Sequence, residues 1–258
     1  MRVLVVSSFP PRHCGIGAYA RDQVRRLRAS GDRVTVLSPP DGAGDVRVPF
    51  TGGGAFRRAA SIGGAFDRLV VHFQPALYYR PRAPLSKVAT SLSLWWLVVR
   101  RRRTEIVVHE ADRPTRWRPD YGILRLALRA APRLLFHTAA EREALERRYR
   151  IHVRAALIPH RVDPVPAVAG VSREEARRRL GIEAGGGPLF LSAGFLQPSK
   201  GFDRALEAFA RAFGEVPDAG SVEPSEPADG SGNGSNEPPP PGATLYLVGS
   251  VREDTAGN

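Results

Sequence analysis

Short runs of apolar residues recur along the first 160 residues and alternate with stretches of helical periodicity. These runs are apolar at nearly every position and not at every second one, which is typical of strands covered on both faces. Strands of this kind alternating with helices predict an α/β fold built on a doubly wound parallel sheet. The predicted strands are Arg2–Val6, Arg33–Leu37, Leu69–Phe73, Glu105–His109, Leu134–His137 and Ala155–Ile158.

The stretches between these runs carry apolar residues at helical spacing. The spacing predicts a helix over Ala18–Ala29, with Tyr19, Val24 and Leu27 toward the core, and Gly31 closes it. Further helices are predicted over Gly122–Ala131 and Ala139–Arg150.

A second unit is predicted after Asp163-Pro164, which gives domains over residues 1–163 and 164–258. Ser172 and Glu175 form a capping-box pattern that opens a helix ending at Gly181. The remaining predicted elements are a strand over Pro188–Ala193, a helix over Asp203–Phe213 packing Leu206, Phe209 and Phe213, and a strand over Thr244–Val248.

The segment Pro217–Gly242 interrupts this second domain. It holds five acidic residues, no basic residue, and proline or glycine at nearly half of its positions. Because such a composition cannot bury a core, we expect a disordered insertion in a surface loop. With only two predicted strands, the second sheet is expected to be incomplete.

Two glycine-bearing turns each connect a predicted strand to a predicted helix. One contains Gly15 and Gly17, and the other runs from Gly194 to Lys200 and Gly201. Helix N-termini present unpaired N–H groups and partial positive charge, which suit phosphate. The sequence therefore predicts two anion sites and a phosphorylated ligand held between two domains.

Other interpretations of these turns stay open. Gly15-x-Gly17-x-x-Ala20 satisfies the relaxed dinucleotide fingerprint of a nicotinamide-dependent oxidoreductase. However, eight residues with two prolines separate Val6 from Gly15, and no acidic residue ends the second strand at Leu37. A purely structural turn and a solvated surface lysine are the ordinary alternatives for the two sites.

His109 is the candidate catalytic residue. It ends a strongly apolar strand and is followed by Glu110 and Asp112, and ligands of open α/β sheets gather at the carboxyl ends of strands. A structural histidine is the alternative, because His72, His137 and His160 also lie near strand ends. No metal-ligand spacing such as HExxH occurs, so no metal site and no cofactor are expected.

The net charge of +12 raises the question of an anionic partner. Of the 38 basic residues only Lys87 and Lys200 are lysines, a balance typical of codon bias in a GC-rich genome. No aromatic residues interleave with arginines as in a base-stacking surface, so no nucleic-acid partner is expected. Peripheral contact with an anionic membrane is the more plausible use of the charge.

The apolar segment Leu92–Val99, which contains Trp95 and Trp96, is followed by Arg100 to Arg103. This arrangement fits a membrane interface, although a helix packed on the sheet with a basic end is the simpler interpretation. The run is far shorter than the roughly 20 residues that span a bilayer. Cys14 is the only cysteine and fits a reducing compartment. We therefore expect a cytoplasmic protein, with peripheral contact at the inner membrane face as a further expectation.

Together these segments resemble the family 4 glycosyltransferases, retaining enzymes with the GT-B architecture of two Rossmann-like domains. The resemblance implies an acceptor-side first domain, a donor-side second domain, and sugar transfer from a nucleotide-sugar donor to a glycan or lipid-linked hydroxyl acceptor. Such transfer serves glycan, glycolipid or polysaccharide synthesis. The resembling segments are Val3–Tyr19, Ile106–Asp112, Leu157–Asp163, Phe190–Ala208 and Leu245–Gly249.

The resemblance also implies roles for single residues. His109 would line the reaction centre, and Gly17, with Gly15 beside it, would lie near the donor phosphate. Lys200, in the turn between Gly194 and Gly201, would bind the donor diphosphate. No metal would be needed, because lysine and helix N-termini neutralise the leaving diphosphate.

Two departures from the family pattern bear on activity. Phe195 occupies the position where the family has an arginine, and the family's E-x7-E segment would lie beyond Asn258. We therefore expect little or no turnover from these 258 residues alone. A non-catalytic sugar-nucleotide-binding or interaction module is the alternative function, and an NAD(P)-dependent oxidoreductase is the third.

Overall fold

The computed structural model describes residues 1–110, 118–160, 170–182, 188–196, 200–213 and 244–250. The chain divides into two compact units, Met1–Val162 and Asp163–Asn258. The predicted insertion Pro217–Gly242 and the predicted domain junction at Asp163-Pro164 lie outside the described residues.

The first unit is built on a seven-stranded sheet in which every neighbouring pair is parallel. The strand order is β3-β2-β1-β4-β5-β6-β7, so the chain winds outward in one direction from β1 and then in the other from β4. The strands are β1 Arg2–Val6, β2 Arg33–Ser38, β3 Val46–Arg47, β4 Arg68–Phe73, β5 Thr104–Val108, β6 Arg133–Phe136 and β7 Ala155–Leu157.

Both faces of this sheet are covered, as the continuous apolar pattern predicts. Leu4 and Val6 of β1 lie in one buried cluster, while Val3 and Val5 of the same strand lie in a second cluster with Val24. Burying each such side chain contributes about 1.5–3 kcal/mol. The alternation of strand residues between two buried clusters is what requires helices on both sides.

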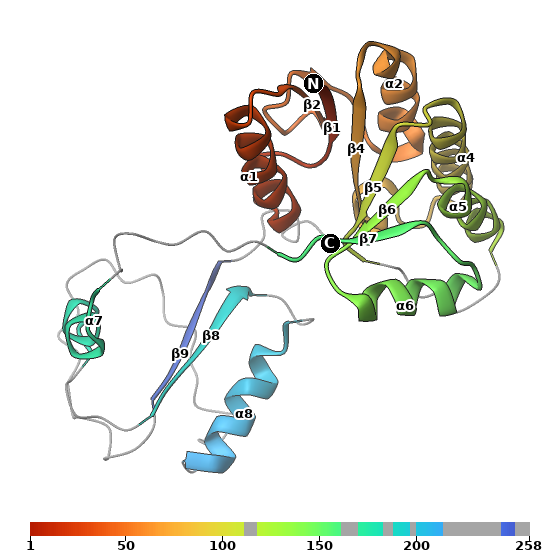
Figure 1. Cartoon of the computed structure of the whole chain (residues 1–258). Helices are drawn as coiled ribbons and strands as arrows, with labels where there is room; N and C mark the ends of the chain where they lie inside the picture. The colour runs from red at the N-terminus through yellow and green to blue at the C-terminus, as the bar shows by residue number, and fades with distance from the viewer. Residues whose placement is uncertain (111–117, 161–169, 183–187, 197–199, 214–243, 251–258) are drawn as a thin grey trace. The chain divides into compact units, whose positions relative to one another are not determined.

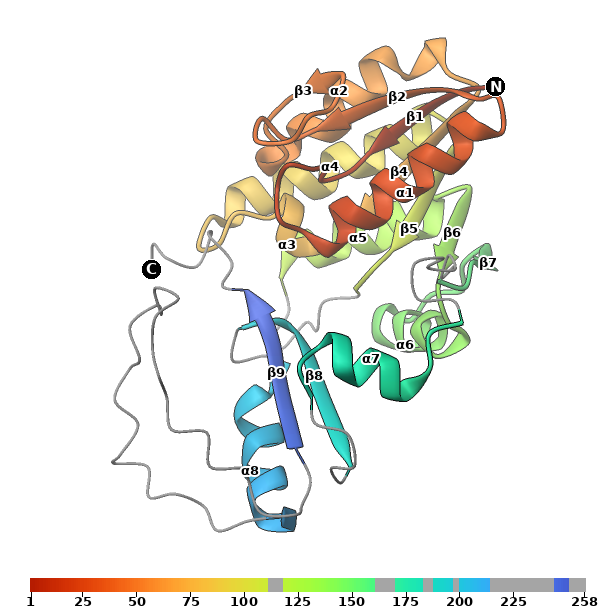
Figure 2. The ribbon, with the colours of Figure 1, turned by 90° about the vertical axis from the view of Figure 1, so that its left-hand side faces the viewer.

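Three helices, α2, α4 and α5, pack side by side on one face of the sheet, and α1 covers the other face (Figures 1 and 2). The apolar segment with Trp95 and Trp96 belongs to α4, which is longer than the predicted run. The helices of this unit are α1 Gly15–Ala29, α2 Gly54–Ile62, α3 Pro75–Tyr78, α4 Pro84–Arg100, α5 Pro119–Ala130 and α6 Ala139–Tyr149, with short 3-10 turns η1 Thr51–Gly53 and η2 Gly63–Ala65.

The described part of the second unit contains two parallel strands and two helices: α7 Arg173–Arg179, β8 Leu189–Phe195, α8 Phe202–Phe213 and β9 Thr244–Ser250. The predicted cap of α7 is present, since Ser172 Oγ accepts from the Glu175 N–H at 3.1 Å. Phe209 and Phe213 contact Phe190 with ring centroids 5.7 and 5.3 Å apart. Leu206, which the spacing predicts as packed, is instead more than half exposed.

The α/β fold class is therefore confirmed, and the first unit has the predicted doubly wound sheet. Among the described residues, no helix combines the length and apolar character needed to cross a membrane.

The junction of η1 with α4 offers a test of this packing. Gly53 is buried with a φ of +80°, and a Cβ there would meet Ser93 Oγ and lie 2.9 Å from the Ala89 carbonyl oxygen. We expect Gly53→Ala to lower the free energy of unfolding by at least about 2 kcal/mol. Gly122→Ala, in open space on α5, should instead raise it by about 0.5–1 kcal/mol.

Urea unfolding followed by tryptophan fluorescence measures both changes, because all three tryptophans precede residue 163. Equal stability of the two variants would show that the η1–α4 contact is looser than the structure describes.

Candidate functional site

The candidate site lies at the carboxyl ends of the parallel strands in the first unit. The winding of the sheet reverses between β1 and β4, and ligands of open α/β sheets bind at such switch points. His72 lies in β4, and His109, His137 and His160 come directly after β5, after β6 and just beyond β7. The sheet thus brings together four histidines that are far apart in sequence.

Tyr19 of α1 is the centre of this histidine cluster. Its ring lies edge-on to all four imidazoles, with centroids 5.2–5.5 Å apart. Spacing along α1 predicts Tyr19 as a core residue, but it is half-buried against histidines and not in the apolar core. This prediction is wrong because the ring lies at the end of the sheet, beyond the apolar clusters.

Hydrogen bonds determine which ring nitrogen carries the hydrogen in His72 and in His109. His72 is fully buried; its Nε2 lies 2.9 Å from Gln23 Oε1 and its Nδ1 lies 2.9 Å from His109 Nε2. The Gln23 oxygen can only accept, so His72 Nε2 carries the hydrogen and Nδ1 is the acceptor. His109 Nε2 is then the donor, which leaves His109 Nδ1 as an unprotonated acceptor.

Burial keeps both imidazoles neutral. Desolvation, reinforced by the neighbouring His109 and His137, holds the pKa of His72 well below its usual range. Desolvation, together with His137 and His160, lowers the pKa of His109 to about 4. At neutral pH the pair therefore offers hydrogen-bonding groups and no positive charge.

His109 remains accessible in spite of this burial. Its backbone N–H donates to the Phe73 carbonyl at 3.0 Å, which holds the residue at the edge of the sheet. The side chain is half-buried and lines a cavity of about 240 Å³ with Glu110, Glu141 and Arg148. Acidic and basic side chains therefore both border His109, the candidate catalytic residue.

His137 and His160 form a second pair, stacked with centroids 3.7 Å apart. His137 Nδ1 donates to the Ile158 carbonyl at 2.9 Å, so its Nε2 is an acceptor. That Nε2 is buried and has no partner among the described residues. Desolvation and the adjacent His137 lower the pKa of His160.

The N-terminus of α1, which follows β1 after eight residues, is the first of the two predicted anion sites. Its N-cap residue Cys14 makes no side-chain capping hydrogen bond, so the N–H groups of the first turn have no side-chain acceptor from that position. Gly17 is buried, and a Cβ there would lie 3.3 Å from Ser8 Oγ; Gly15 faces open space. The hydroxyls of Ser7 and Ser8 are buried without a partner in the described structure.

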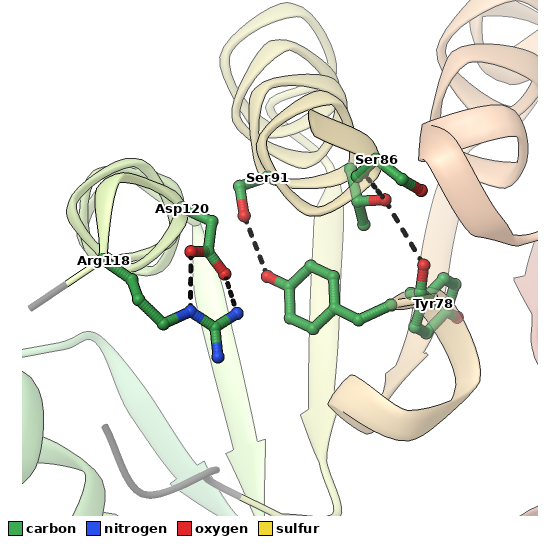
Figure 3. Close-up of polar contacts among 7 residues, drawn as sticks. Tyr78, Ser86, Ser91, Arg118 and Asp120 are labelled. Carbon is green, nitrogen blue, oxygen red and sulfur yellow. Dashed lines mark hydrogen bonds and ion pairs between the residues drawn. The ribbon is translucent and has the colours of Figure 1, made fainter. Parts of the chain in front are cut away.

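A buried polar cluster where α3, α4 and α5 meet supports this edge of the sheet (Figure 3). The Arg118 guanidinium donates two hydrogen bonds to the Asp120 carboxylate, at 3.0 and 2.5 Å, and the hydroxyls of Tyr79 and Ser91 lie 2.8 Å apart. The Tyr78 hydroxyl donates to the His72 carbonyl at 2.8 Å. The segment after β4 is thereby tied to the strand that carries His72.

The second unit holds the other predicted site residues. Gly194 lies within β8, and Lys200 is exposed two residues before the start of α8. Gly201 has a φ of +68°, and the Arg204 guanidinium lies where a Cβ at this position would point, 2.9 Å away. The start of α8 thus carries two cations, Lys200 and Arg204, and the sequence had singled out only the first.

Among the predicted residues of the first unit, the structure places Gly15 and Gly17 in the first turn of α1 and His109 beside Tyr19 of the same helix. Sequence reasoning missed Tyr19 and Gln23 as site residues. The available signal was their i, i+4 spacing on α1, combined with histidines at the ends of successive strands.

The low pKa of His109 predicts an acid-sensitive first unit. Below pH 6.5 the unfolded chain takes up a proton at this histidine, whereas the folded protein does so only near pH 4. The free energy of unfolding should therefore fall by up to roughly 3 kcal/mol between pH 6.5 and 4 on account of His109. His109→Gln should remove that part of the pH dependence, measured by urea unfolding, and His13→Gln, in an exposed loop, should not. An unchanged pH slope in His109→Gln would contradict the buried neutral state.

Comparison with known proteins gives a likeness of fold. No protein-family model matches the chain, and no curated protein sequence is significantly similar to it. A solved structure of an alpha-glucosyltransferase in complex with UDP-glucose and DNA containing an abasic site is similar over 99% of this chain and 69% of that one. The identity is 11% and the TM-score is 0.50. The chain therefore has an α/β fold of the GT-B glycosyltransferase type.

Proposed function

We propose that this protein is a glycosyltransferase that moves a sugar from a nucleotide-diphosphate sugar to a hydroxyl acceptor with retention, as the family 4 enzymes do. The observation that carries the proposal is the neutral His109 at the carboxyl edge of the first sheet, in a fold similar to that of a glucosyltransferase solved with UDP-glucose. A glycan or lipid-linked acceptor follows from the resemblance to the family.

The protonation of His109 defines its part in the reaction. A group with a pKa near 4 is a weak base at neutral pH, so we assign it an orienting role. Its acceptor Nδ1 takes a hydrogen bond from a hydroxyl of the sugar, while Nε2 is held by His72. His72 and Gln23 act through His109 as positioning residues.

Residues other than His109 stabilise the charge on the leaving diphosphate in the proposed reaction. In the proposed transfer the bond between the anomeric carbon and the diphosphate oxygen breaks, a bond to the acceptor oxygen forms, and the hydroxyl proton leaves with the diphosphate. Positioned cations and helix N-termini stabilise the charge that develops on the diphosphate. We assign this task to Lys200 and Gly201, with Gly15 and Gly17 of α1 near the donor phosphate, and no metal is needed.

Arg204 is our candidate to replace the arginine that the family has at the position of Phe195. The family pattern has two diphosphate cations, and Phe195 replaces one of them. The guanidinium of Arg204 lies over Gly201, next in sequence to Lys200, so it can supply the missing charge. A non-catalytic sugar-nucleotide-binding module remains the second candidate function, and Phe195 is the residue that favours it.

The oxidoreductase alternative gains no support from the dinucleotide fingerprint. Eight residues, Ser7 to Cys14, separate β1 from α1, where a dinucleotide site needs a tight turn. β2 ends at Ser38, whose hydroxyl donates to the Pro39 carbonyl, and offers no carboxylate for a ribose.

Calorimetry on the whole chain tests the proposal. We expect UDP or GDP to bind more tightly than NADH, because the predicted contacts recognise a diphosphate at helix N-termini and not a nicotinamide. Release of nucleotide from any of a panel of nucleotide-sugars would identify a transferase, whereas binding without release fits both the binding module and the low turnover expected of these 258 residues. A clear preference for NADH would overturn the proposal.

Two matched pairs of variants test the cations. Lys200→Ala and Arg204→Ala should each weaken nucleotide-diphosphate binding about tenfold, the effect of losing one charged hydrogen bond. Lys87→Ala and Arg211→Ala are the controls; Arg211 lies on α8 with Arg204 but pairs with Glu207 at 3.8 Å. If Arg204→Ala and Arg211→Ala bind equally, the second cation is not Arg204.

A further inference from the structure

The outer face of α4 carries a stripe of exposed apolar side chains, and the adjoining α5 adds one more. On α4 these are Leu85, Leu92, Trp95, Trp96 and Val99, between 38% and 85% exposed. Leu126 on the adjoining α5 is 55% exposed. Single exposed apolar residues are ordinary, but a contiguous row that includes two tryptophans is not.

The row follows from the periodicity of α4. Positions 92, 95, 96 and 99 repeat at i, i+3, i+4 and i+7, and therefore form one face of the helix. The opposite face, with Leu94, Leu97 and Val98, is fully buried in the core. The exposed stripe is therefore not needed to hold α4 on the sheet.

The helices that carry or adjoin this stripe are rich in basic residues and nearly free of acidic ones. The only acidic residue in the sequences of α2, α4 and α5 is Asp120, which is buried and paired with Arg118. By contrast, α6 alone carries three glutamates. The basic residues on the three helices are Arg57, Arg58, Lys87, Arg100, Arg125 and Arg129.

A cavity at the end of α4 extends the basic surface. It measures about 360 Å³ and is lined by Arg100 to Arg103 together with Gly63, Gly64, Phe66 and Leu69. The Arg100 guanidinium lies over the Trp96 ring, 5.7 Å from its centroid. Cationic groups therefore lie directly beside the aromatic part of the stripe, an order that suits the headgroup level of a bilayer.

We propose that the outer face of α2, α4 and α5 docks on a lipid bilayer that contains anionic lipids. Trp95 and Trp96 insert at the level of the headgroups with Leu92 and Val99, and the flanking arginines contact lipid phosphates. This inference does not rest on the proposed function, since docking needs no nucleotide.

A bilayer fits the whole surface better than other anionic or apolar partners do. A second copy of the chain on this face would bring like charges together. A nucleic acid would neutralise the arginines but would leave the aliphatic residues of the stripe in water. Only a lipid surface offers hydrocarbon and phosphate at once.

Vesicle sedimentation of the whole chain is the test, with phosphatidylcholine alone and mixed with phosphatidylglycerol. We expect binding to the mixed vesicles and little to the neutral ones. Arg100→Glu/Arg129→Glu should weaken partitioning by well over the roughly fivefold that loss of one basic contact brings. Arg21→Glu/Arg147→Glu, on α1 and α6, changes the net charge equally and should bind more tightly than the first pair.

The apolar contribution needs its own readout. In a Trp117→Phe background the remaining fluorescence comes from Trp95 and Trp96 and should shift to the blue on mixed vesicles. Trp95→Ser/Trp96→Ser should lose most vesicle binding. Nucleotide binding and urea unfolding of each variant confirm that the fold is kept, and nucleotide binding reports on the proposed function separately.

Three results would overturn the proposal. The first is equal loss of binding in the two charge-reversal pairs, which would indicate net charge without a defined surface. The second is binding of duplex DNA with no binding to vesicles. The third is a dimer in ultracentrifugation that Trp95→Ser/Trp96→Ser dissolves, which would assign the stripe to a second copy of the chain.

Discussion

Burial of the parallel strands on both faces is the constraint on which the first unit depends. Because successive strand residues enter two different apolar clusters, helices must cover both sides of the sheet. Parallel pairing in turn sends every crossover back across the sheet, so all strands end at the same edge. The positions of the loops, and of any polar residue that ends a strand, follow from that arrangement.

The histidine cluster is a consequence of this edge. His72, His109 and His137 approach one another only because β4, β5 and β6 are neighbours in the sheet. Burial, reinforced by the neighbouring histidines, disfavours protonation of His72 and His109. At neutral pH this edge of the first sheet therefore presents the His72–His109 pair as uncharged hydrogen-bonding groups.

Sequence reasoning predicted the long strands to within two residues, because a continuous apolar run has few other interpretations. It missed α2, which begins at Gly54, the last of three consecutive glycines that suggest a loop in the sequence. Only the structure shows that Gly53 packs closely against Ser93 of α4. The candidate site was found only in part. His109 ends a strand and could be singled out, but the contacts of Tyr19 depend on how α1 sits on the sheet, which spacing along one helix does not encode.

In α4 the apolar pattern of the sequence does not predict which side chains are buried. A helix apolar on all sides would ordinarily be buried on all sides. Here the core takes Leu94 and Leu97, the neighbouring helices flank the helix, and Trp95 and Trp96 are left in contact with water. Exposed apolar surface of this kind gives no stability to the fold and favours aggregation. Arginines around this surface would repel a second copy of the chain, and for that reason the partner proposed for the stripe is both anionic and apolar.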